Sequence, residues 1–119
     1  MKPLHPFGWD ALPLEQMTDD ITRQMMSGAH TTVARIVLLR GAVVPRHCHP
    51  SEQLSVVVSG ALRFTFDEGE RDVGPGQMIF IPSGVPHAAL ALEDTVDLDV
   101  FGPPREDWIT GNDAYLRRK

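Results

Sequence analysis

The chain of 119 residues is long enough for one domain with a buried core and leaves no room for a second. Its formal net charge is −5, and no run of Lys and Arg precedes the last three residues, so we expect no nucleic-acid partner. No apolar run approaches the roughly 20 residues of a membrane span, and residues 1–20 lack a basic stretch followed by an apolar core. These features predict a cytoplasmic protein without a membrane partner, and the single cysteine, Cys48, agrees with a reducing compartment.

The first half of the chain contains several strand patterns. Residues 21–26 are a weaker strand candidate with a short helix as the alternative, whereas residues 32–40 are rich in β-branched and aliphatic side chains and end at Gly41. Two apolar runs, 54–59 and 61–66, flank Gly60 and predict a β-hairpin, with a further turn over residues 67–70.

The second half continues the same pattern and then changes character. Residues 78–81 form a short strand candidate, and residues 85–92 and 95–101 are predicted to pair across an acidic turn at Glu93 and Asp94. In the tail, residues 103–119, we expect a short helix or turn through which Trp108 and Tyr115 cover one end of the fold. Ten Gly and ten Pro are spread along the chain, as in short strands joined by tight turns. Together these elements predict an all-β sandwich or barrel.

Two glycine-bracketed segments carry the histidines of interest. In the first, five residues separate Gly41 from His47; His49 follows, Gln53 lies four positions further, and Gly60 closes the segment. In the second, Gly76 is followed after five residues by Pro82, Ser83 and Gly84, and three positions later by His87. Alternation along a strand places His47 and His49 on one face and Cys48 on the other, where we expect it to be a small buried hydrophobe.

These two segments resemble the two motifs of the cupin superfamily, whose RmlC-like members are jelly-roll β-barrels. The resemblance implies a single-domain cupin jelly roll (a double-stranded β-helix) over residues 1–119. Its core spans about 31–102, and residues 1–30 and 103–119 pack on the barrel. It also implies a metal bound by His47, His49, Gln53 and His87. The chain departs from the family where Gln53 replaces the usual Glu and where Ala91 replaces a frequent Asn.

The expected ligand set is neutral, with three imidazole nitrogens and one amide oxygen. Such a set suits one divalent transition metal, Ni, Zn, Mn, Fe or Co, without choosing among them. Two alternatives remain for the fourth ligand. Gln53 can orient a metal-bound water or substrate instead of binding the metal, and Glu52 can replace it if the local register slips.

The segment LDVFGPPREDW, residues 98–108, narrows the resemblance to the pectin-degradation proteins known as KdgF, over about residues 17–108. This similarity implies ring opening of 4,5-unsaturated uronate monosaccharides, released from pectin or alginate by lyases, to linear keto-deoxyuronates. It implies an anionic sugar substrate with Asp99 as acid/base and Phe101 lining the sugar site. Arg105 is implied as both a catalytic and a substrate-binding residue, since its permanently charged guanidinium suits the substrate carboxylate.

The strand at 95–101 also permits an ordinary reading in which Val96, Leu98 and Val100 are buried and Asp99 is solvated. If Asp99 and Phe101 face the cavity instead, the outer apolar stripe needs a cover, and a homodimer partner or the N-terminal segment would supply it. Arg105 can equally anchor the tail through Glu106 or Asp107. Two other functions stay open, namely a cupin dioxygenase acting on a small organic substrate and a non-catalytic metal- or ligand-binding cupin.

Overall fold

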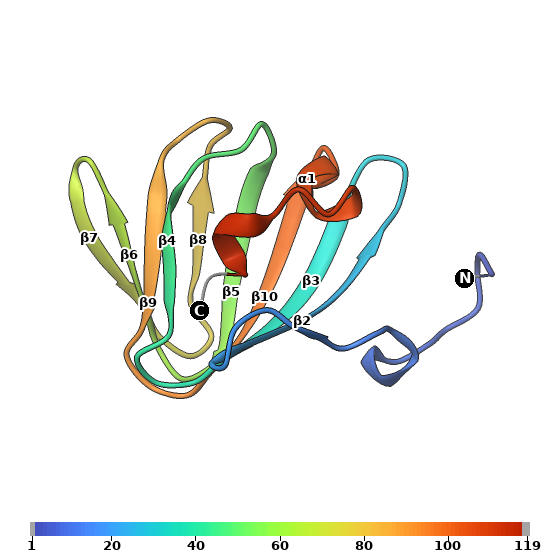
Figure 1. Ribbon diagram of the computed structural model, residues 1–119, viewed down its shortest axis with the longest axis horizontal. Helices are drawn as coiled ribbons and strands as arrows, with labels where there is room; N and C mark the ends of the chain where they lie inside the picture. The colour runs from blue at the N-terminus through green and yellow to red at the C-terminus, as the bar shows by residue number, and fades with distance from the viewer. Residues whose placement is uncertain (1, 118–119) are drawn as a thin grey trace.

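The computed structural model describes residues 2–117. Within them, ten strands form two antiparallel sheets (Figure 1). The six-stranded sheet has the order β1-β2-β3-β10-β5-β8, and the four-stranded sheet has the order β4-β9-β6-β7. The elements are η1 (Trp9–Ala11), β1 (Glu15–Gln16), β2 (Ile21–Ser27), β3 (Thr32–Leu38), β4 (Val43–His47), β5 (Glu52–Ser59), β6 (Leu62–Phe66), β7 (Gly69–Val73), β8 (Met78–Ile81), β9 (His87–Ala91), β10 (Thr95–Gly102), α1 (Glu106–Ile109) and η2 (Ala114–Leu116).

The predicted all-β jelly roll is confirmed, and each strand candidate from the sequence coincides with an observed strand. The weaker candidate at 21–26 is a strand, β2, rather than a helix. It pairs with β3 along seven residue pairs, so part of the predicted N-terminal segment 1–30 belongs to the six-stranded sheet.

Both predicted hairpins in the barrel are wrong, because each predicted turn is a corner where the chain changes sheets. β5 pairs with β10 and β8, whereas β6 pairs with β7 and β9 in the other sheet. In the same way β9 and β10 lie in different sheets. Gly60 at the first corner has a φ of +84°, and a Cβ there would lie 2.3 Å from the Asp94 carbonyl oxygen of the second corner. The two corners therefore pack against each other, and only glycine fits at position 60.

Strand alternation separates an inner face from an outer face in the six-stranded sheet. On β10, Asp97, Asp99 and Phe101 are buried, while Val96, Leu98 and Val100 point outward. The reading that leaves Asp99 solvated is therefore wrong. The inner faces of both sheets enclose the hydrophobic core, which includes Ile21, Ala34, Leu38, Val57, Leu62, Phe64, Val73, Ile81, Ala89, Ala91 and Phe101.

The C-terminal tail folds back over the barrel and contacts β4 through η2 (Figure 1). Trp108 packs on Phe101 and Tyr115 stacks on His47, which confirms that these two aromatic residues cover one end of the fold. A buried ion pair between Arg23 of β2 and Asp113 (3.0 Å) anchors the tail. Residues 118 and 119 of the predicted tail lie outside the described residues.

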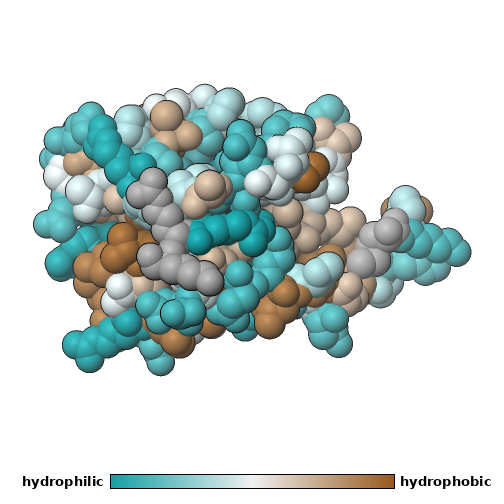
Figure 2. Space-filling view, viewed as in Figure 1, coloured by the Kyte–Doolittle hydropathy of each residue, from teal (hydrophilic) through white to brown (hydrophobic). Residues whose placement is uncertain are grey.

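The N-terminal segment before β1 extends away from the barrel (Figures 1 and 2). In Figure 2 hydrophobic residues gather along the lower half of the face shown, whereas the upper edge is mostly hydrophilic. None of the helices in residues 2–117 has both the length and the apolar character required to cross a membrane.

Candidate metal centre

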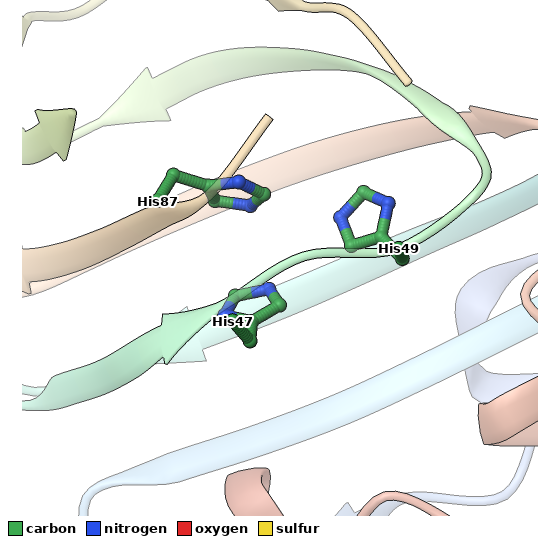
Figure 3. A group of neighbouring side chains, drawn as sticks. All are labelled: His47, His49 and His87. Atoms are coloured by element: carbon green, nitrogen blue, oxygen red, sulfur yellow. The ribbon is translucent and has the colours of Figure 1, made fainter. Parts of the chain in front are cut away.

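Three histidines meet between the two sheets. His47 ends β4, His49 lies two residues further in the following loop, and His87 begins β9. His47 and His87 are directly paired in the register of β4 and β9, next to an irregularity between Val44 and His47. One nitrogen from each ring lies within 4.8 Å of the others, and the rings turn toward a shared space (Figure 3). The spacing of the two sequence motifs therefore brings the predicted histidine trio together.

The backbone fixes the orientation of each imidazole in the same way. Nδ1 of His47, His49 and His87 lies 2.8 Å from the carbonyl oxygen of Pro45, Ser51 and Val85, respectively. A carbonyl oxygen only accepts, so each Nδ1 carries the proton and donates it. In a neutral ring the lone pair is then on Nε2. The Nε2 of His87 is buried without a hydrogen-bond partner, as expected for an atom that binds a metal.

The three rings are held in their neutral form. Burial lowers the pKa of His47 and of His49 from 6.5 to about 4, and the positive charge of Arg105 and the repulsion that a second protonated histidine would meet act in the same direction. Burial also lowers the pKa of His87. Neutral imidazoles with free Nε2 lone pairs are the form that binds divalent transition metals.

This charge state predicts that the metal-free protein loses stability as the pH falls from about 6.5 to about 4. In that window the unfolded histidines bind protons that the folded ones exclude, so the free energy of unfolding rises with pH. The raised pKa of Asp97 makes the free energy of unfolding change with pH in the opposite direction. Comparing variants isolates the contribution of the histidines. In urea unfolding between pH 7 and pH 4.5 with chelator, we expect His49→Gln to flatten the slope and the exposed His5→Gln to leave it unchanged. An equal slope in wild type and His49→Gln would contradict this.

Gln53 completes the donor set. Its Oε1 lies 3.0 Å from Nε2 of His49, and its Nε2 donates to Oγ of Ser55 at 2.8 Å. Oε1 of Gln53 and Nε2 of His49 thus face each other with lone pairs in a buried site, because His49 donates its proton from Nδ1 to the carbonyl oxygen of Ser51. A cation bound by both atoms would remove the repulsion between the lone pairs, so these residues fit a divalent metal. Glu52, the alternative ligand, is exposed on the opposite face of β5.

Asp99 lies beside this donor set and accepts a 2.6 Å hydrogen bond from Oγ of Ser55. Asp97 is its neighbour on the same face of β10, and both carboxyl groups are buried. Burial, together with the adjacent charge and hydrogen bond of Asp99, raises the pKa of Asp97 well above its ordinary value. Burial thus favours the protonated form of Asp97, while Asp99 accepts the hydrogen bond of Ser55.

Phe101 and Arg105 are also buried at the site, but the polar edge of Arg105 is already engaged. Its Nε and Nη2 donate to the two carboxylate oxygens of Asp107 at 2.9 and 2.7 Å, and Nη2 also donates to the hydroxyl of Tyr115. Its guanidinium carbon lies 4.8 Å from the ring centre of Phe101 and 4.2 Å from that of Trp108. Arg105 thus anchors the tail through Asp107, which was the alternative predicted for it.

A cavity of about 50 Å³ lies among these side chains. It is bounded on the polar side by His47, Gln53, His87, Asp97, Asp99, Arg105 and Tyr115. This volume holds a few water molecules. A larger groove of about 890 Å³ lies at the open edge between β7 and β8; the three histidines do not line it, but Val85 and Pro86, which directly precede His87, do.

Sequence reasoning missed three residues of this site and misplaced one. Ser55 lies two positions after Gln53 on β5, and Asp97 lies two positions before Asp99 on β10. Because residues two apart on a strand share a face, both could have been predicted from the neighbouring site residues. Tyr115 was predicted only as a cover, and its contact with His47 depends on tail folding that no local pattern encodes. Cys48 does point away from the histidines, but it is exposed rather than buried, because it lies in the loop after β4.

Comparison with known families agrees with this geometry. The model of the Cupin domain family matches residues 34–101, more than half of the chain, so the protein belongs to this family. The matched segment contains all four predicted ligands together with Asp99 and Phe101.

Two solved structures are similar over most of the chain. KdgF from Halomonas sp. is 28% identical with a TM-score of 0.76, covering 83% of this chain and 94% of that one. An RmlC-like cupin from Shewanella frigidimarina is 27% identical with a TM-score of 0.80, covering 90% and 96%. The predicted KdgF-like, RmlC-like character of the chain is thereby confirmed at the level of the fold and family.

A curated relative matches a shorter stretch. Dimethylsulfoniopropionate lyase DddQ from Ruegeria pomeroyi is 39% identical over 49 residues, which is 40% of this chain. The match spans 24% of the length of that relative, about a quarter.

Proposed function

We propose that the protein is a metal-dependent enzyme that opens the ring of 4,5-unsaturated uronate monosaccharides and yields linear keto-deoxyuronates. The observation that carries this proposal is the placement of Asp99. A buried carboxylate on β10 shares one small cavity with three neutral histidines and an amide. The similarity to KdgF over 94% of that chain supports the substrate class.

His47, His49, His87 and Gln53 are the residues that would hold the metal. A bound divalent ion acts as a Lewis acid and template for oxygen atoms of the substrate or of water, with no change of oxidation state. The backbone contacts of the three Nδ1 atoms fix the rings before the ion arrives. The chemistry of the site then depends on what Asp99 does with protons.

Ring opening begins with addition of water across the C4=C5 double bond, with hydroxyl at C5 and hydrogen at C4. Asp99 takes a proton from the water as its oxygen bonds to C5 and delivers a proton to C4, so the carboxylate is regenerated. The resulting hemiketal loses its C5 hydroxyl proton as the bond between C5 and the ring oxygen breaks, and that oxygen, which stays on C1, takes up a proton. C1 then carries two hydroxyl groups and loses one molecule of water, so the products are a ketone at C5 and an aldehyde at C1, and the water added at C5 is balanced by the water lost at C1.

Arg105 and Phe101 are proposed to bind the sugar. The carboxylate of a uronate carries the same charge and geometry as the carboxylate of Asp107, so substrate binds Arg105 by displacing Asp107 or through the remaining nitrogen, Nη1. Phe101 already stacks on the guanidinium and presents its ring edge to His49. It forms the apolar wall between the cation and the metal ligands.

The 50 Å³ cavity is smaller than a sugar ring requires, so substrate entry needs the tail to move. Tyr115 stacks on His47 at 4.5 Å and its hydroxyl accepts hydrogen bonds from Arg105 and Trp108. Displacing Tyr115 and Leu116 opens the cavity on the side of the metal ligands, since both residues line it.

The assay that tests the proposal follows the ultraviolet absorbance of the enol ether in unsaturated galacturonate. We expect metal-loaded protein to accelerate its loss above the spontaneous rate, and we expect a chelator to remove the acceleration. An unchanged rate with protein shown to contain metal would refute ring opening on this substrate; unsaturated mannuronate is the parallel substrate.

A second candidate is cleavage of dimethylsulfoniopropionate, favoured by the 39% identity to the lyase DddQ over 49 residues. The same metal-loaded protein incubated with dimethylsulfoniopropionate releases dimethyl sulfide only if this second function is correct. Gas chromatography of the headspace therefore separates the two candidates.

We also propose a homodimer that covers the outer face of the six-stranded sheet. Val33, Val100, Leu54 and Phe80 lie side by side in the register of four adjacent strands, and each is exposed. Such an apolar row on an outer face is typical of a covered surface. Sedimentation of the wild type should give a dimer, and Leu54→Asp should give a monomer. A monomeric wild type would contradict the proposal.

A further inference from the structure

A chain of three buried side chains connects the fourth metal ligand to the acid/base carboxylate. Nε2 of Gln53 donates to Oγ of Ser55 at 2.8 Å, and Oγ of Ser55 donates to Oδ1 of Asp99 at 2.6 Å. All three side chains face the barrel interior, because Gln53 and Ser55 are two apart on β5 and Ser55 is the register partner of Asp99 on β10. We infer that Ser55 is a positioning residue that fixes the amide of Gln53, and that Asp99 is the reason why residue 53 is an amide.

The direction of the two hydrogen bonds follows from the donors available. A carboxylate only accepts hydrogen bonds and a serine hydroxyl has one proton, so the hydroxyl of Ser55 donates to Asp99. The hydroxyl oxygen can then only accept from residue 53, which must therefore be a donor. Gln53 meets this need with its NH₂ group, and this fixes its Oε1 on the opposite side, 3.0 Å from Nε2 of His49.

Asp97 lies beside Asp99 on the inner face of β10. The two carboxyl groups are both buried, and burial together with the charge of Asp99 raises the pKa of Asp97. One oxygen of Asp97, Oδ1, is buried without a hydrogen-bond partner, which is unfavourable for a charged carboxylate and tolerable for an acid. The direction of the two hydrogen bonds is thus set by Asp99, the final acceptor, and is transmitted through Ser55 to Gln53.

A glutamate in place of Gln53 would break this order. The introduced carboxylate and Asp99 would both accept, and the single proton of Ser55 would serve only one of them, leaving a buried acceptor unpaired. Replacing Asp99 by asparagine as well lets every group find a hydrogen-bond partner again, with both bonds reversed. The asparagine NH₂ group then donates to Ser55, Ser55 donates to the introduced glutamate, and the asparagine carbonyl accepts a hydrogen bond from the carboxyl group of Asp97.

The test is a double-mutant cycle on Co²⁺ binding, read by the visible spectrum of the bound ion and by competition with a chelator. The four proteins are wild type, Gln53→Glu, Asp99→Asn and the double variant. A carboxylate binds a metal more strongly than an amide, but here it also leaves a buried acceptor unpaired, so the effect of Gln53→Glu alone on Co²⁺ affinity has no fixed sign. The quantity measured is therefore the coupling, that is, the difference between the effects of Gln53→Glu in the two backgrounds. We expect Gln53→Glu to favour Co²⁺ binding about tenfold more in the Asp99→Asn background than in the wild-type background.

Charge repulsion between the introduced glutamate and Asp99 would also produce coupling, and Ser55 separates the two causes. Without the hydroxyl, in Ser55→Ala, the hydrogen-bond contribution is lost, so the coupling should fall to about threefold or less. Ser55→Thr keeps a hydroxyl and should keep the coupling. If the coupling is absent in proteins that keep Ser55, the inference is overturned by that result alone. If the coupling in Ser55→Ala is as large as with Ser55 present, the inference is overturned, and charge repulsion between the two carboxylates is the cause.

The inference rests on the metal centre of the proposed function and not on its substrate, and the experiment separates the two. Wild type that fails to bind Co²⁺ refutes the metal centre and the inference together. Wild type that binds Co²⁺ without the predicted coupling refutes the role of Ser55 and leaves ring opening to be decided by the uronate assay.

Discussion

Asp99→Asn is expected to reduce uronate ring opening by a factor of about 10² to 10⁴ while the protein keeps its metal. The amide has nearly the same shape, but it neither takes a proton from water nor returns one. The asparagine can turn its carbonyl oxygen toward Ser55, so the hydrogen bond now made to Asp99 and the amide of Gln53 are preserved. Rates under saturating substrate, with metal content measured on the same sample, provide the check.

The matched control for this variant is Asp67→Asn, an exposed carboxylate that pairs with Arg46 on the surface. It should retain wild-type turnover. If Asp99→Asn retained turnover within about threefold with full metal content, Asp99 would not be the proton carrier, since a general acid/base contributes more than that.

His87→Gln is expected to weaken divalent metal binding by at least about 100-fold, and turnover should disappear at metal concentrations that saturate the wild type. Even partners that only orient a ligand contribute about 10- to 100-fold in affinity, and removing the ligand itself has the larger effect. The Nε2 of His87 has no hydrogen-bond partner in residues 2–117, so losing that atom breaks no hydrogen bond, although the substitution also removes the bond from Nδ1 to the carbonyl oxygen of Val85. Calorimetry with Zn²⁺ or Co²⁺ measures the affinity directly.

His30→Gln is the control for His87→Gln, because His30 is an exposed histidine outside the site. It should bind metal as the wild type does. Wild-type metal affinity in His87→Gln would show that the ion binds elsewhere, and the histidine trio would then have another role.

Seven strands were predicted because local composition and alternation define them, whereas β1, β4 and β7 were given no range from the sequence. β3 and β10 were recognised from their β-branched and alternating residues. Strand pairing failed because a corner between sheets and a hairpin turn have the same local signature. Gly60 has the positive φ typical of a turn, but what makes it necessary is contact with the second corner at Asp94, which is distant along the chain.

The candidate site divides in the same way. His47, His49 and His87 were predictable because the two glycine-bracketed segments resemble the cupin motifs, and the structure brings the three histidines together and buries Gln53 on β5. Alternation alone favoured burial of Val100 and solvation of Asp99, and only the similarity to KdgF argued otherwise. The structure buries Asp99, because the outer face of β10 carries Val96, Leu98 and Val100 and its inner face lines the metal cavity.

The pairing of Arg105 with Asp107 was left open by the sequence because both a substrate carboxylate and a neighbouring aspartate satisfy a guanidinium. Three-dimensional packing decides between them, because Tyr115 and Trp108 hold the guanidinium against Asp107.

Metal-dependent ring opening is decided by the rate at which unsaturated galacturonate loses its enol-ether absorbance, recorded with metal-loaded and with chelator-treated protein. We expect acceleration over the spontaneous reaction that disappears with chelator, returns on adding metal back, and is absent in Asp99→Asn. A spontaneous rate unchanged by metal-loaded wild type, or an acceleration equal in Asp99→Asn, would contradict it.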